Sequence, residues 1–189
     1  MKILLTGHSG FIGQSILKLL LKKKIKLSVT KYNNLSIPKE KNISIIDLKK
    51  DKIQFDNFDI VIHTAWDKLD NYDSNDHVKK ILSSNFKFLT KLIKMGSKNL
   101  IILGTCFEVG DCYGEIDEKI KLNPTTKYGL AKKKLLSKLL SIKKKYKFNL
   151  TWVRIFYLYG ENQRNKSLFK QIEIASKKKS QKTFEMTSG

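Results

Sequence analysis

A tyrosine and a lysine, Tyr128 and Lys132, have types and a spacing that could do acid–base chemistry. The surrounding pattern predicts a helix over 126–146, and positions i and i+4 of a helix lie on one face. A nearby ammonium stabilises a phenolate and so lowers the pKa of a tyrosine from its usual value of about 10. Tyr128 is therefore a candidate proton donor or acceptor near neutral pH. The alternative is an incidental surface pair on a lysine-rich helix.

A hydroxyl and a thiol are adjacent in the sequence at the end of a predicted strand. Thr105 and Cys106 follow the apolar run 100–103. A threonine hydroxyl there can hydrogen-bond a carbonyl or alcohol oxygen of a substrate, although it could also serve only as a turn residue. Cys106 is a poor candidate nucleophile, because all three histidines precede it and no acidic residue is placed to orient one.

A glycine-rich turn near the N-terminus indicates a second kind of chemistry. Residues Thr6–Gly13 read Thr-Gly-His-Ser-Gly-Phe-Ile-Gly and follow the apolar run 3–5. Glycine permits the positive φ of a sharp strand-to-helix turn and lets backbone N–H groups approach a pyrophosphate. The helix that begins near Phe11 aims the positive end of its dipole at that charge. The pattern predicts a dinucleotide-binding turn, against the alternative of an ordinary turn between strand and helix.

The elements that must position these groups alternate along the chain. Predicted strands cover 2–5, 26–30, 43–46, 59–62, 100–103 and 150–155. Predicted helices cover 11–21, 75–94, 126–146 and 166–177. This alternation predicts an α/β fold, a doubly wound parallel sheet of the Rossmann type in three α/β/α layers. The expected strand order is 3-2-1-4-5-6, with ligands at the carboxyl ends of the strands.

Length and composition fit one globular domain over 1–189, because 41% of the 189 residues are hydrophobic. No apolar run reaches the length of a membrane-spanning helix, and two cysteines make no disulfide framework. We therefore expect a cytoplasmic protein that engages no membrane and no metal. The 38 Lys and Arg against 17 Asp and Glu give a net charge of +21. Lysines spread along several helices favour solvated surfaces over a specific nucleic-acid site.

Together these signals resemble the extended short-chain dehydrogenase/reductase family of nucleotide-sugar epimerases, dehydratases and reductases. The resemblance covers essentially the whole chain and rests on six motifs in the family's order. They are Thr6–Gly13 for T-G-x-x-G-F-I-G, Asp47-Leu48 after the third strand, His63-Thr64-Ala65 for H-x-A-A, Asn85 in the long helix, Asn123-Pro124 with Tyr128 and Lys132 for N-P-x-x-x-Y-x-x-x-K, and Arg154–Gly160 for R-x-x-N-V-Y-G. Trp66 replaces the final alanine of H-x-A-A.

The resemblance implies roles for the site residues. Tyr128 would be the acid/base at a sugar C4 oxygen, Lys132 would lower its pKa and bind the nicotinamide ribose, and Thr105 would hold the reacting oxygen. Hydride would move between the nicotinamide and the sugar carbon. With Tyr128 and Lys132, the expected cofactor-binding residues are Gly7, Gly10, Phe11, Ile12, Gly13, Lys31, Asp47, Leu48, His63, Ala65, Asn85 and Phe156.

Departures from the family pattern narrow the expected reaction. The family's 4,6-dehydratases carry Asp-Glu where this chain has Cys106-Phe107, so dehydration is disfavoured. The stretch Gly104–Gly110 resembles the subgroup that reduces nucleotide-bound 4-keto-6-deoxy sugars, in the synthesis of surface-polysaccharide precursors. The alternatives are a nucleotide-sugar 4-epimerase with bound NAD and a non-catalytic dinucleotide-binding module.

The end of the second predicted strand bears on cofactor choice. NAD enzymes place an acidic residue there for the ribose diol, whereas this chain has Lys31 and no acid before Glu40. Lys31 could meet a 2′-phosphate, which favours NADP over NAD.

The resemblance also implies a further C-terminal portion that builds most of the nucleotide-sugar pocket. We expect residues 160–189 to begin this portion and the rest to be largely absent from this chain. Tyr157 stands where the family has its substrate-contacting asparagine. The helices 75–94 and 126–146 resemble those that pair in the family's dimers, so a homodimer is expected.

Overall fold

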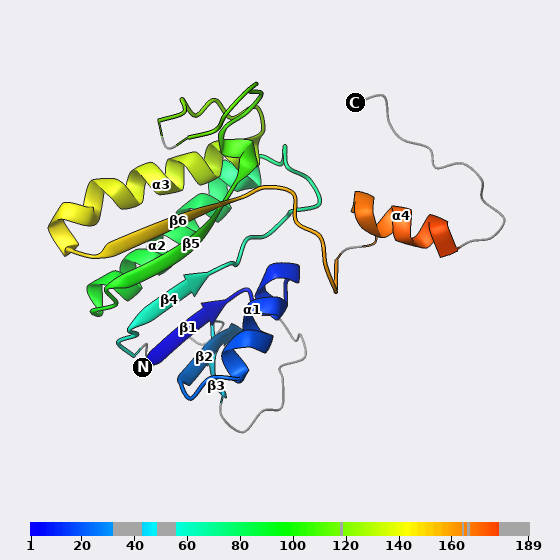
Figure 1. The fold of residues 1–189 in the computed structure, drawn as a ribbon. Coiled ribbons are helices and arrows are strands. Elements are labelled where there is room, and N and C mark those ends of the chain that lie inside the picture. Colours follow the sequence, from blue (N-terminus) through cyan, green and yellow to red (C-terminus); the bar gives the residue numbers. More distant parts are fainter. Residues whose placement is uncertain (32–42, 49–55, 118, 164, 166, 178–189) are drawn as a thin grey trace. The chain divides into compact units, whose positions relative to one another are not determined.

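A computed structural model gives the fold and describes residues 1–31, 43–48, 56–117, 119–163, 165 and 167–177 (Figure 1). The chain divides into two compact units, Met1–Phe156 and Tyr157–Gly189. The first unit contains the sheet and all of the predicted site residues.

Six parallel strands form one sheet in the order β3-β2-β1-β4-β5-β6. This confirms the predicted strand order and the doubly wound topology. The strands are β1 Lys2–Thr6, β2 Lys26–Lys31, β3 Ile43–Asp47, β4 Ile60–His63, β5 Asn99–Thr105 and β6 Asn149–Ile155. Because all the strands are parallel, their carboxyl ends meet at one edge of the sheet.

Side chains of β1 alternate between two hydrophobic clusters on opposite faces of the sheet. Ile3 and Leu5 pack in the cluster that includes Leu17 of α1 (Phe11–Leu21), whereas Leu4 packs in the cluster that includes Leu89 and Leu135 on the other face. Successive residues of a strand point to opposite faces, so an unbroken apolar strand indicates that both faces are covered. The sheet therefore lies between helical layers, as the α/β/α prediction required.

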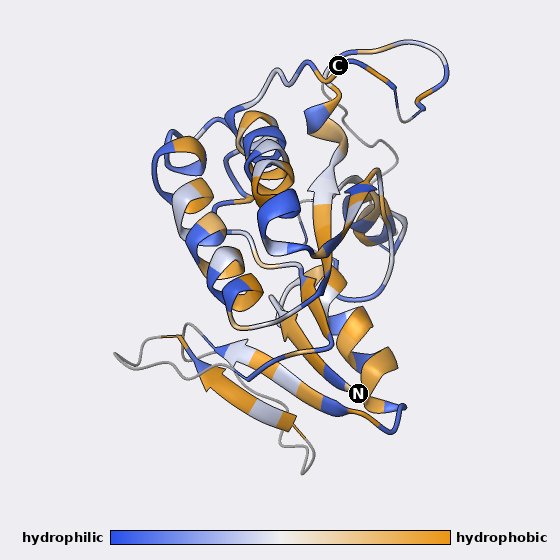
Figure 2. Ribbon diagram, turned by 90° about the vertical axis from the view of Figure 1, so that its left-hand side faces the viewer, coloured by the Kyte–Doolittle hydropathy of each residue, from blue (hydrophilic) through white to orange (hydrophobic). Residues whose placement is uncertain are grey.

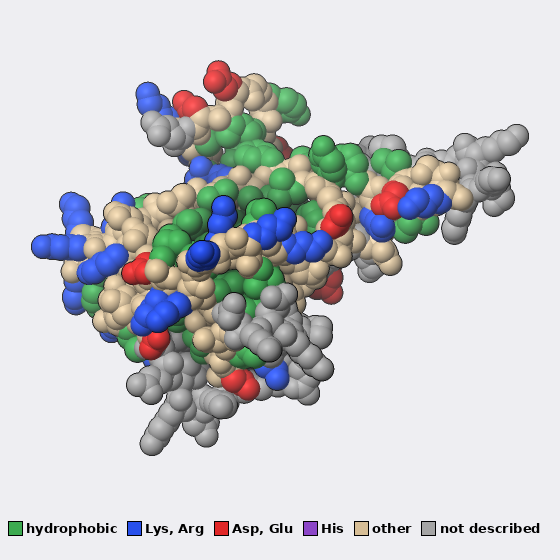
Figure 3. Space-filling model, turned by 60° about the horizontal axis from the view of Figure 1, so that its bottom comes forward, with side chains coloured by type: hydrophobic (Ala, Val, Ile, Leu, Met, Phe, Trp, Pro, Cys, Tyr) green, Lys and Arg blue, Asp and Glu red, His purple; other side chains and the backbone are tan. Residues whose placement is uncertain are grey.

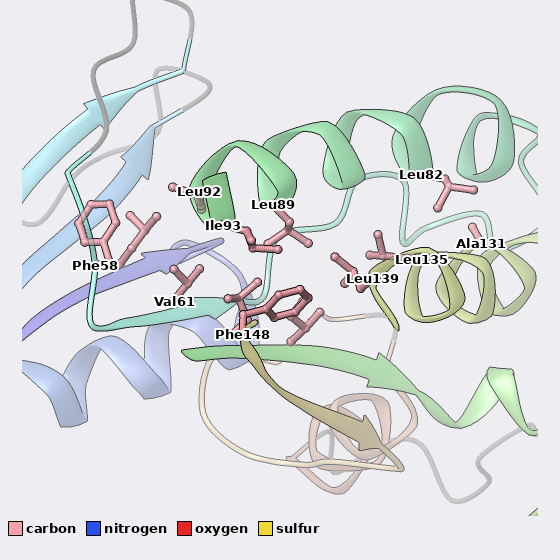
Figure 4. Close-up of a cluster of buried hydrophobic side chains, with 13 residues drawn as sticks. Phe58, Val61, Leu82, Leu89, Leu92, Ile93, Ala131, Leu135, Leu139 and Phe148 are labelled. Carbon is pink, nitrogen blue, oxygen red and sulfur yellow. The ribbon is translucent and has the colours of Figure 1, made fainter. Parts of the chain in front are cut away.

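The larger cluster fills the space between β4, β5, α2 (Leu82–Lys94) and α3 (Lys127–Tyr146). Figure 4 shows Leu89, Leu92 and Ile93 of α2 directed toward the side chains of α3 and β4. In Figure 2 the strands are mainly hydrophobic, while the helices combine hydrophobic and hydrophilic residues. This pattern is typical of amphipathic helices that cover a buried sheet.

The helix predicted over 75–94 is interrupted near its start. A π-helical turn, η1 His77–Ile81, precedes α2. A π turn shifts the register of the side chains that follow, and such turns often occur near functional sites. Here the turn contains the buried side chain of His77.

The helix predicted over 126–146 is α3. Its N-cap is Thr126, whose hydroxyl oxygen accepts from the Gly129 N–H at 3.1 Å. This cap begins α3 two residues before Tyr128 and so fixes where that side chain leaves the helix.

In the second unit, α4 spans Leu168–Lys177. Ion pairs join Glu173 to Lys170 and to Lys177. The rings of Tyr159 and Phe169 lie 5.4 Å apart between their centroids. Residues 178–189 of the portion predicted over 160–189 lie outside the described residues.

Candidate active site

The glycine turn, Thr6–Gly13, connects the end of β1 to the start of α1. Gly7 has a φ of +71°, and a Cβ there would lie 2.7 Å from the backbone nitrogen of Ala65. A Cβ on Gly13 would lie 2.0 Å from the Gly7 carbonyl oxygen. Gly7 and Gly13 are therefore required by the chain's own packing.

Gly10 differs, because the fold does not require a glycine there. Its φ of −77° and ψ of 166° suit any residue, and a Cβ would meet only the Gly7 carbonyl oxygen at 3.3 Å. No side chain caps the N-terminus of α1, which begins with Phe11 and Ile12. The missing Cβ leaves open space beside uncapped N–H groups. This cradle fits the phosphates of a dinucleotide.

The end of β4 is tied to the glycine turn by Thr6. The Thr6 hydroxyl lies 2.8 Å from His63 Nδ1 and accepts from the Ala65 N–H at 3.4 Å. Burial, together with the positive charge of Lys132, lowers the pKa of His63 to about 3. The buried imidazole therefore stays neutral and acts as a spacer between strands. Ala65, which donates to the Thr6 hydroxyl, lies directly against Gly7.

The ends of β2 and β3 hold the residues predicted for the adenosine half. Lys31 pairs with Asp47 in the parallel register, and the Leu48 N–H donates to the Lys31 carbonyl oxygen at 2.8 Å. The lysine predicted to read a 2′-phosphate therefore has an acidic residue directly beside it on the next strand. Residues 32–42, with Glu40, lie outside the described residues.

Thr105, Tyr128 and Lys132, here called the tyrosine site, are brought together from β5 and α3. All three side chains are buried, and the Thr105 side chain is close enough to the Tyr128 hydroxyl to influence its pKa. Thr105 ends β5, one strand beyond β4. The tyrosine site thus lies at the same edge of the sheet as the glycine turn.

The pKa of Tyr128 is raised in this structure, contrary to the lowering predicted from its spacing to Lys132. Burial is the main cause, and the neighbouring Thr105 side chain acts in the opposite direction. The rings of Tyr72 and Phe107 pack against Tyr128 at centroid distances of 5.5 and 6.2 Å. A phenol enclosed in this way is poorly solvated when ionised, so it is held in its protonated form.

Lys132 occupies a buried position deeper than Tyr128. Its Nζ donates to the Leu103 carbonyl oxygen at 2.6 Å and lies 4.2 Å from the centroid of the Trp66 ring. Burial lowers the pKa of Lys132 to about 7, although the Glu108 carboxylate opposes this shift. The ammonium is 5.9 Å from the centroid of the Tyr128 ring. Its present partners are therefore a carbonyl and an indole, rather than the phenol.

An aromatic wall, Trp66, Tyr72 and His77, surrounds Tyr128, and sequence reasoning assigned it no role. The Trp66 indole N–H donates to His77 Nδ1 at 3.1 Å, which leaves the ring proton on Nε2 to be donated to the Asn71 carbonyl oxygen at 2.8 Å. The Tyr72 carbonyl oxygen accepts from the Tyr128 N–H at 2.8 Å. Trp66 was visible in the sequence only as a departure from H-x-A-A.

A buried carboxylate, Glu108, is the second feature that sequence reasoning missed. It lies in the 3-10 turn η2 Cys106–Glu108 and accepts hydrogen bonds from Thr105, Trp152 and Arg154. The spacing Thr-x-x-Glu of a capping box was the signal that could have found it.

The two remaining predicted residues lie at the periphery of the site. The Asn85 amide donates to the Ile81 carbonyl oxygen at 2.9 Å and interacts with His63. Phe156 directly follows β6 and is 42% exposed. Asn85 thus supports a strand end from α2, and Phe156 has a side chain open to solvent.

The excess of Lys and Arg over Asp and Glu in the composition is visible on the surface. Figure 3 shows Lys and Arg side chains spread over one face, with fewer Asp and Glu side chains among them. None of the helices in the described part of the chain is long and apolar enough to cross a membrane. Within those same residues, no group of three or more His, Cys, Asp or Glu side chains is arranged to hold a metal ion.

Comparisons with known proteins agree with this geometry. The model of the NAD dependent epimerase/dehydratase family matches residues 3–187. A dTDP-6-deoxy-L-talose 4-dehydrogenase (NAD(+)) of Aggregatibacter actinomycetemcomitans is 28% identical over 200 residues, which cover 100% of this chain and 73% of that protein.

Two solved structures share the fold. The UDP-glucuronic acid 4-epimerase of Bacillus cereus in complex with NAD has a TM-score of 0.72 and 21% identity, over 93% of this chain and 63% of the epimerase. The dTDP-glucose 4,6-dehydratase of Bacillus anthracis in complex with NAD has a TM-score of 0.70 and 19% identity, over 93% of this chain and 61% of the dehydratase. The chain thus spans about three fifths of the length of these structures.

Proposed function

The chain belongs to the NAD-dependent epimerase/dehydratase family, and from this premise we propose that it is an oxidoreductase acting at carbon 4 of a nucleotide-activated 6-deoxy sugar. One observation carries the proposal. A protonated phenol and a threonine hydroxyl are buried beside each other at the same sheet edge as a cradle suited to a dinucleotide.

Tyr128 and Thr105 supply the proton chemistry of the proposed reaction. The phenol is protonated at neutral pH, so it holds the proton that a C4 ketone oxygen would take up on reduction, and a positive charge beside it would make that transfer easier by stabilising the phenolate. The Thr105 hydroxyl, buried beside Tyr128, would hold that oxygen. In the reverse direction the phenolate would accept the proton of a C4 hydroxyl while Thr105 holds the oxygen.

Lys132 supplies positive charge beneath the phenol. A lysine with a pKa of about 7 is partly charged near neutrality, so it can stabilise a developing phenolate and later release a proton. Its three N–H donors allow a hydrogen bond to a ribose hydroxyl besides the one to Leu103. A bound nicotinamide would supply the hydride, while the glycine turn and Ala65 would hold its phosphates and ribose.

A relative's name supports the reacting carbon and the kind of substrate, and it describes the reaction in the oxidative direction. The Aggregatibacter protein is a 4-dehydrogenase of a dTDP-linked 6-deoxy sugar, and reduction of a 4-keto-6-deoxy sugar is the same chemistry run backwards. This agrees with the subgroup that Gly104–Gly110 resembles. A role in the supply of surface-polysaccharide precursors follows as part of the proposal.

For the cofactor we propose NAD, although Lys31 alone favoured NADP. Asp47 lies beside Lys31 in the register of β2 and β3, and an acidic residue near the ribose hydroxyls repels a 2′-phosphate. The names of the Aggregatibacter relative and of both solved structures include NAD. Titration with NADH and NADPH, followed by nicotinamide fluorescence, tests the choice, and tighter binding of NADPH would overturn it.

The homodimer expected through 75–94 and 126–146 remains a prediction. The solvent-facing side chains of α2 and α3 are mainly lysines and serines, including Lys87, Lys91, Lys134 and Lys138. Two such faces repel each other at low salt, so a dimer formed through them should tighten as salt is raised. Sedimentation velocity at low and high salt tests this, and a dimer that weakens with salt would point to another interface.

The experiment that tests the function follows absorbance of the reduced nicotinamide at equilibrium. The purified chain is mixed with NAD and a dTDP-linked 6-deoxyhexose, and separately with NADH and the corresponding 4-keto sugar. Sustained oxidation or reduction of the cofactor in step with the sugar supports the proposal. Interconversion of C4 epimers with no net change in cofactor would establish an epimerase instead. Cofactor binding without any change in the sugar would leave a non-catalytic module.

A further inference from the structure

Glu108 is a buried carboxylate that the proposed reaction does not use. None of its surface is exposed, and an isolated carboxylate is costly to bury unless hydrogen bonds and a counter-charge compensate it. Its position beside Thr105 raises the question of why a charge is kept there.

Three donors converge on this carboxylate. The Thr105 N–H donates at 2.8 Å, the Trp152 indole N–H at 3.0 and 3.1 Å to the two oxygens, and Arg154 Nε at 3.2 Å. Trp152 and Arg154 are two residues apart on β6, so both reach Glu108 from the same face of the sheet. The carboxylate therefore joins β5, η2 and β6.

Gly104 makes room for this arrangement. A Cβ there would lie 2.3 Å from Trp152 Nε1 and 2.5 Å from Glu108 Oε1. The space next to the strand is thus filled by the carboxylate and the indole nitrogen. A mere capping box would need only the bond from the Thr105 N–H to Glu108 and the one that the Thr105 side chain accepts from the turn, and it would not need Trp152, Arg154 or complete burial.

Glu108 is linked to the tyrosine site in two ways. Its bond to the Thr105 N–H fixes the last residue of β5, whose side chain is buried beside Tyr128. Its negative charge also acts on Lys132, whose Nζ is held by the carbonyl of Leu103. The charged and titratable groups that this carboxylate pairs with or acts on are Arg154 from β6 and Lys132 and Tyr128 from α3, and Tyr128 is also influenced by Cys106 from η2 and Tyr72 from the aromatic wall.

On the basis of the proposed function, we propose that Glu108 is a positioning residue that holds the Thr105 hydroxyl beside Tyr128 and balances the charge of the buried Lys132 ammonium. Arg154 and Trp152 hold the carboxylate in turn. A residue that served only as a structural cap would not influence the protonation of Lys132, whereas Glu108 in the proposed role does.

The test compares two variants that change charge in opposite senses. In E108Q the amide keeps the carboxyl shape and an acceptor oxygen but loses the negative charge. In R154Q the carboxylate stays and its positive partner is lost. The pH profile of kcat should move to lower pH in E108Q, by about one unit, and to higher pH in R154Q. NADH binding, measured by fluorescence, should change much less than the pH profile in both variants, because the glycine turn that would hold the phosphates is elsewhere.

A second readout does not depend on turnover. The chemical shift of the Lys132 side chain is followed by NMR against pH, with K132M used to assign the signal. Its titration midpoint should fall in E108Q and rise in R154Q. If the wild-type chain turns over no sugar, the proposed function fails while this titration still decides the role of Glu108. If E108Q does not fold, R154Q alone tests the proposal, because the titration midpoint of Lys132 should rise in that variant. Midpoints equal to the wild type in the folded variants would overturn the proposal and leave Glu108 a structural cap.

Discussion

The glycine turn and the tyrosine site lie at the same edge of one sheet but are built in different ways. The glycine turn is eight consecutive residues, and its recognition groups are backbone N–H donors and the space left by missing Cβ atoms. The tyrosine site takes its side chains from β5 and α3, with supporting contacts from β6 and from residues 66–77. The first is a local conformation, and the second is an assembly.

This difference determines how each site should respond to change. Backbone donors do not titrate, so ligand recognition at the glycine turn should depend mainly on shape, and the single titratable side chain of the turn, His8, has a pKa that burial lowers. The tyrosine site contains buried ionisable groups whose pKa values depend on burial and on neighbouring charges. It should therefore respond to pH and to the loss of single polar atoms.

The largest expected effect is a loss of turnover at the tyrosine site without a loss of NADH affinity. Y128F removes the phenolic proton and leaves the ring in its aromatic surroundings. We expect kcat to fall by about 10²–10⁴-fold, the usual contribution of a positioned general acid, with NADH affinity unchanged. Steady-state kinetics and a fluorescence titration measure the two quantities. A variant that loses NADH binding as well would show that the two sites are not independent.

The next effect concerns the stability of the tyrosine site against pH. The folded pKa of Lys132, about 7, lies below that of an unfolded lysine, so the unfolded chain binds more protons between these two values. Stability should rise from pH 7 to pH 10, and this group should contribute of the order of 3 kcal/mol to that rise. Urea unfolding at several pH values should show a shallower rise for K132M. Parallel curves for the two proteins would mean that Lys132 is not desolvated.

Two glycine substitutions test the glycine turn, the other of the two sites compared. A Cβ at Gly13 meets the Gly7 backbone, so G13A should destabilise the chain by about 3 kcal/mol. A Cβ at Gly10 meets only the Gly7 carbonyl oxygen, at 3.3 Å, so G10V should destabilise the chain much less than G13A but lose affinity for NADH. Thermal unfolding and NADH titration separate the two results. Normal NADH binding by G10V would mean that no phosphate occupies the cradle.

The smallest effect lies where the two sites meet, at His63. Its folded pKa of about 3 is below the unfolded value, so protons favour the unfolded chain as the pH falls below about 6.5. By pH 5 this group should have cost about 2 kcal/mol of stability. H63Q should lose that part of the acid sensitivity, measured by urea unfolding at pH 7 and pH 5. An unchanged difference between the two pH values would assign the sensitivity to other groups.

Much of the fold could be predicted from the chain. The apolar strands and amphipathic helices fixed the element order, and a parallel α/β alternation left few topologies to choose from. Strand ends moved by one or two residues, and the helix predicted over 75–94 begins instead with the π turn at His77–Ile81. The periodicity of the sequence could not predict the π turn, because its first residue, His77, is hydrogen-bonded to Trp66 outside the helix.

The sequence by itself determined the glycine turn, the order of the strands and the spacing of Tyr128 and Lys132, because these follow from backbone conformation and periodicity along a short stretch. Only the tertiary structure decided the raised pKa of Tyr128, the partners of Lys132 and the burial of Glu108. The physical reason is that a pKa and a buried hydrogen bond depend on every element packed around the group. Those elements lie tens of residues away in the chain.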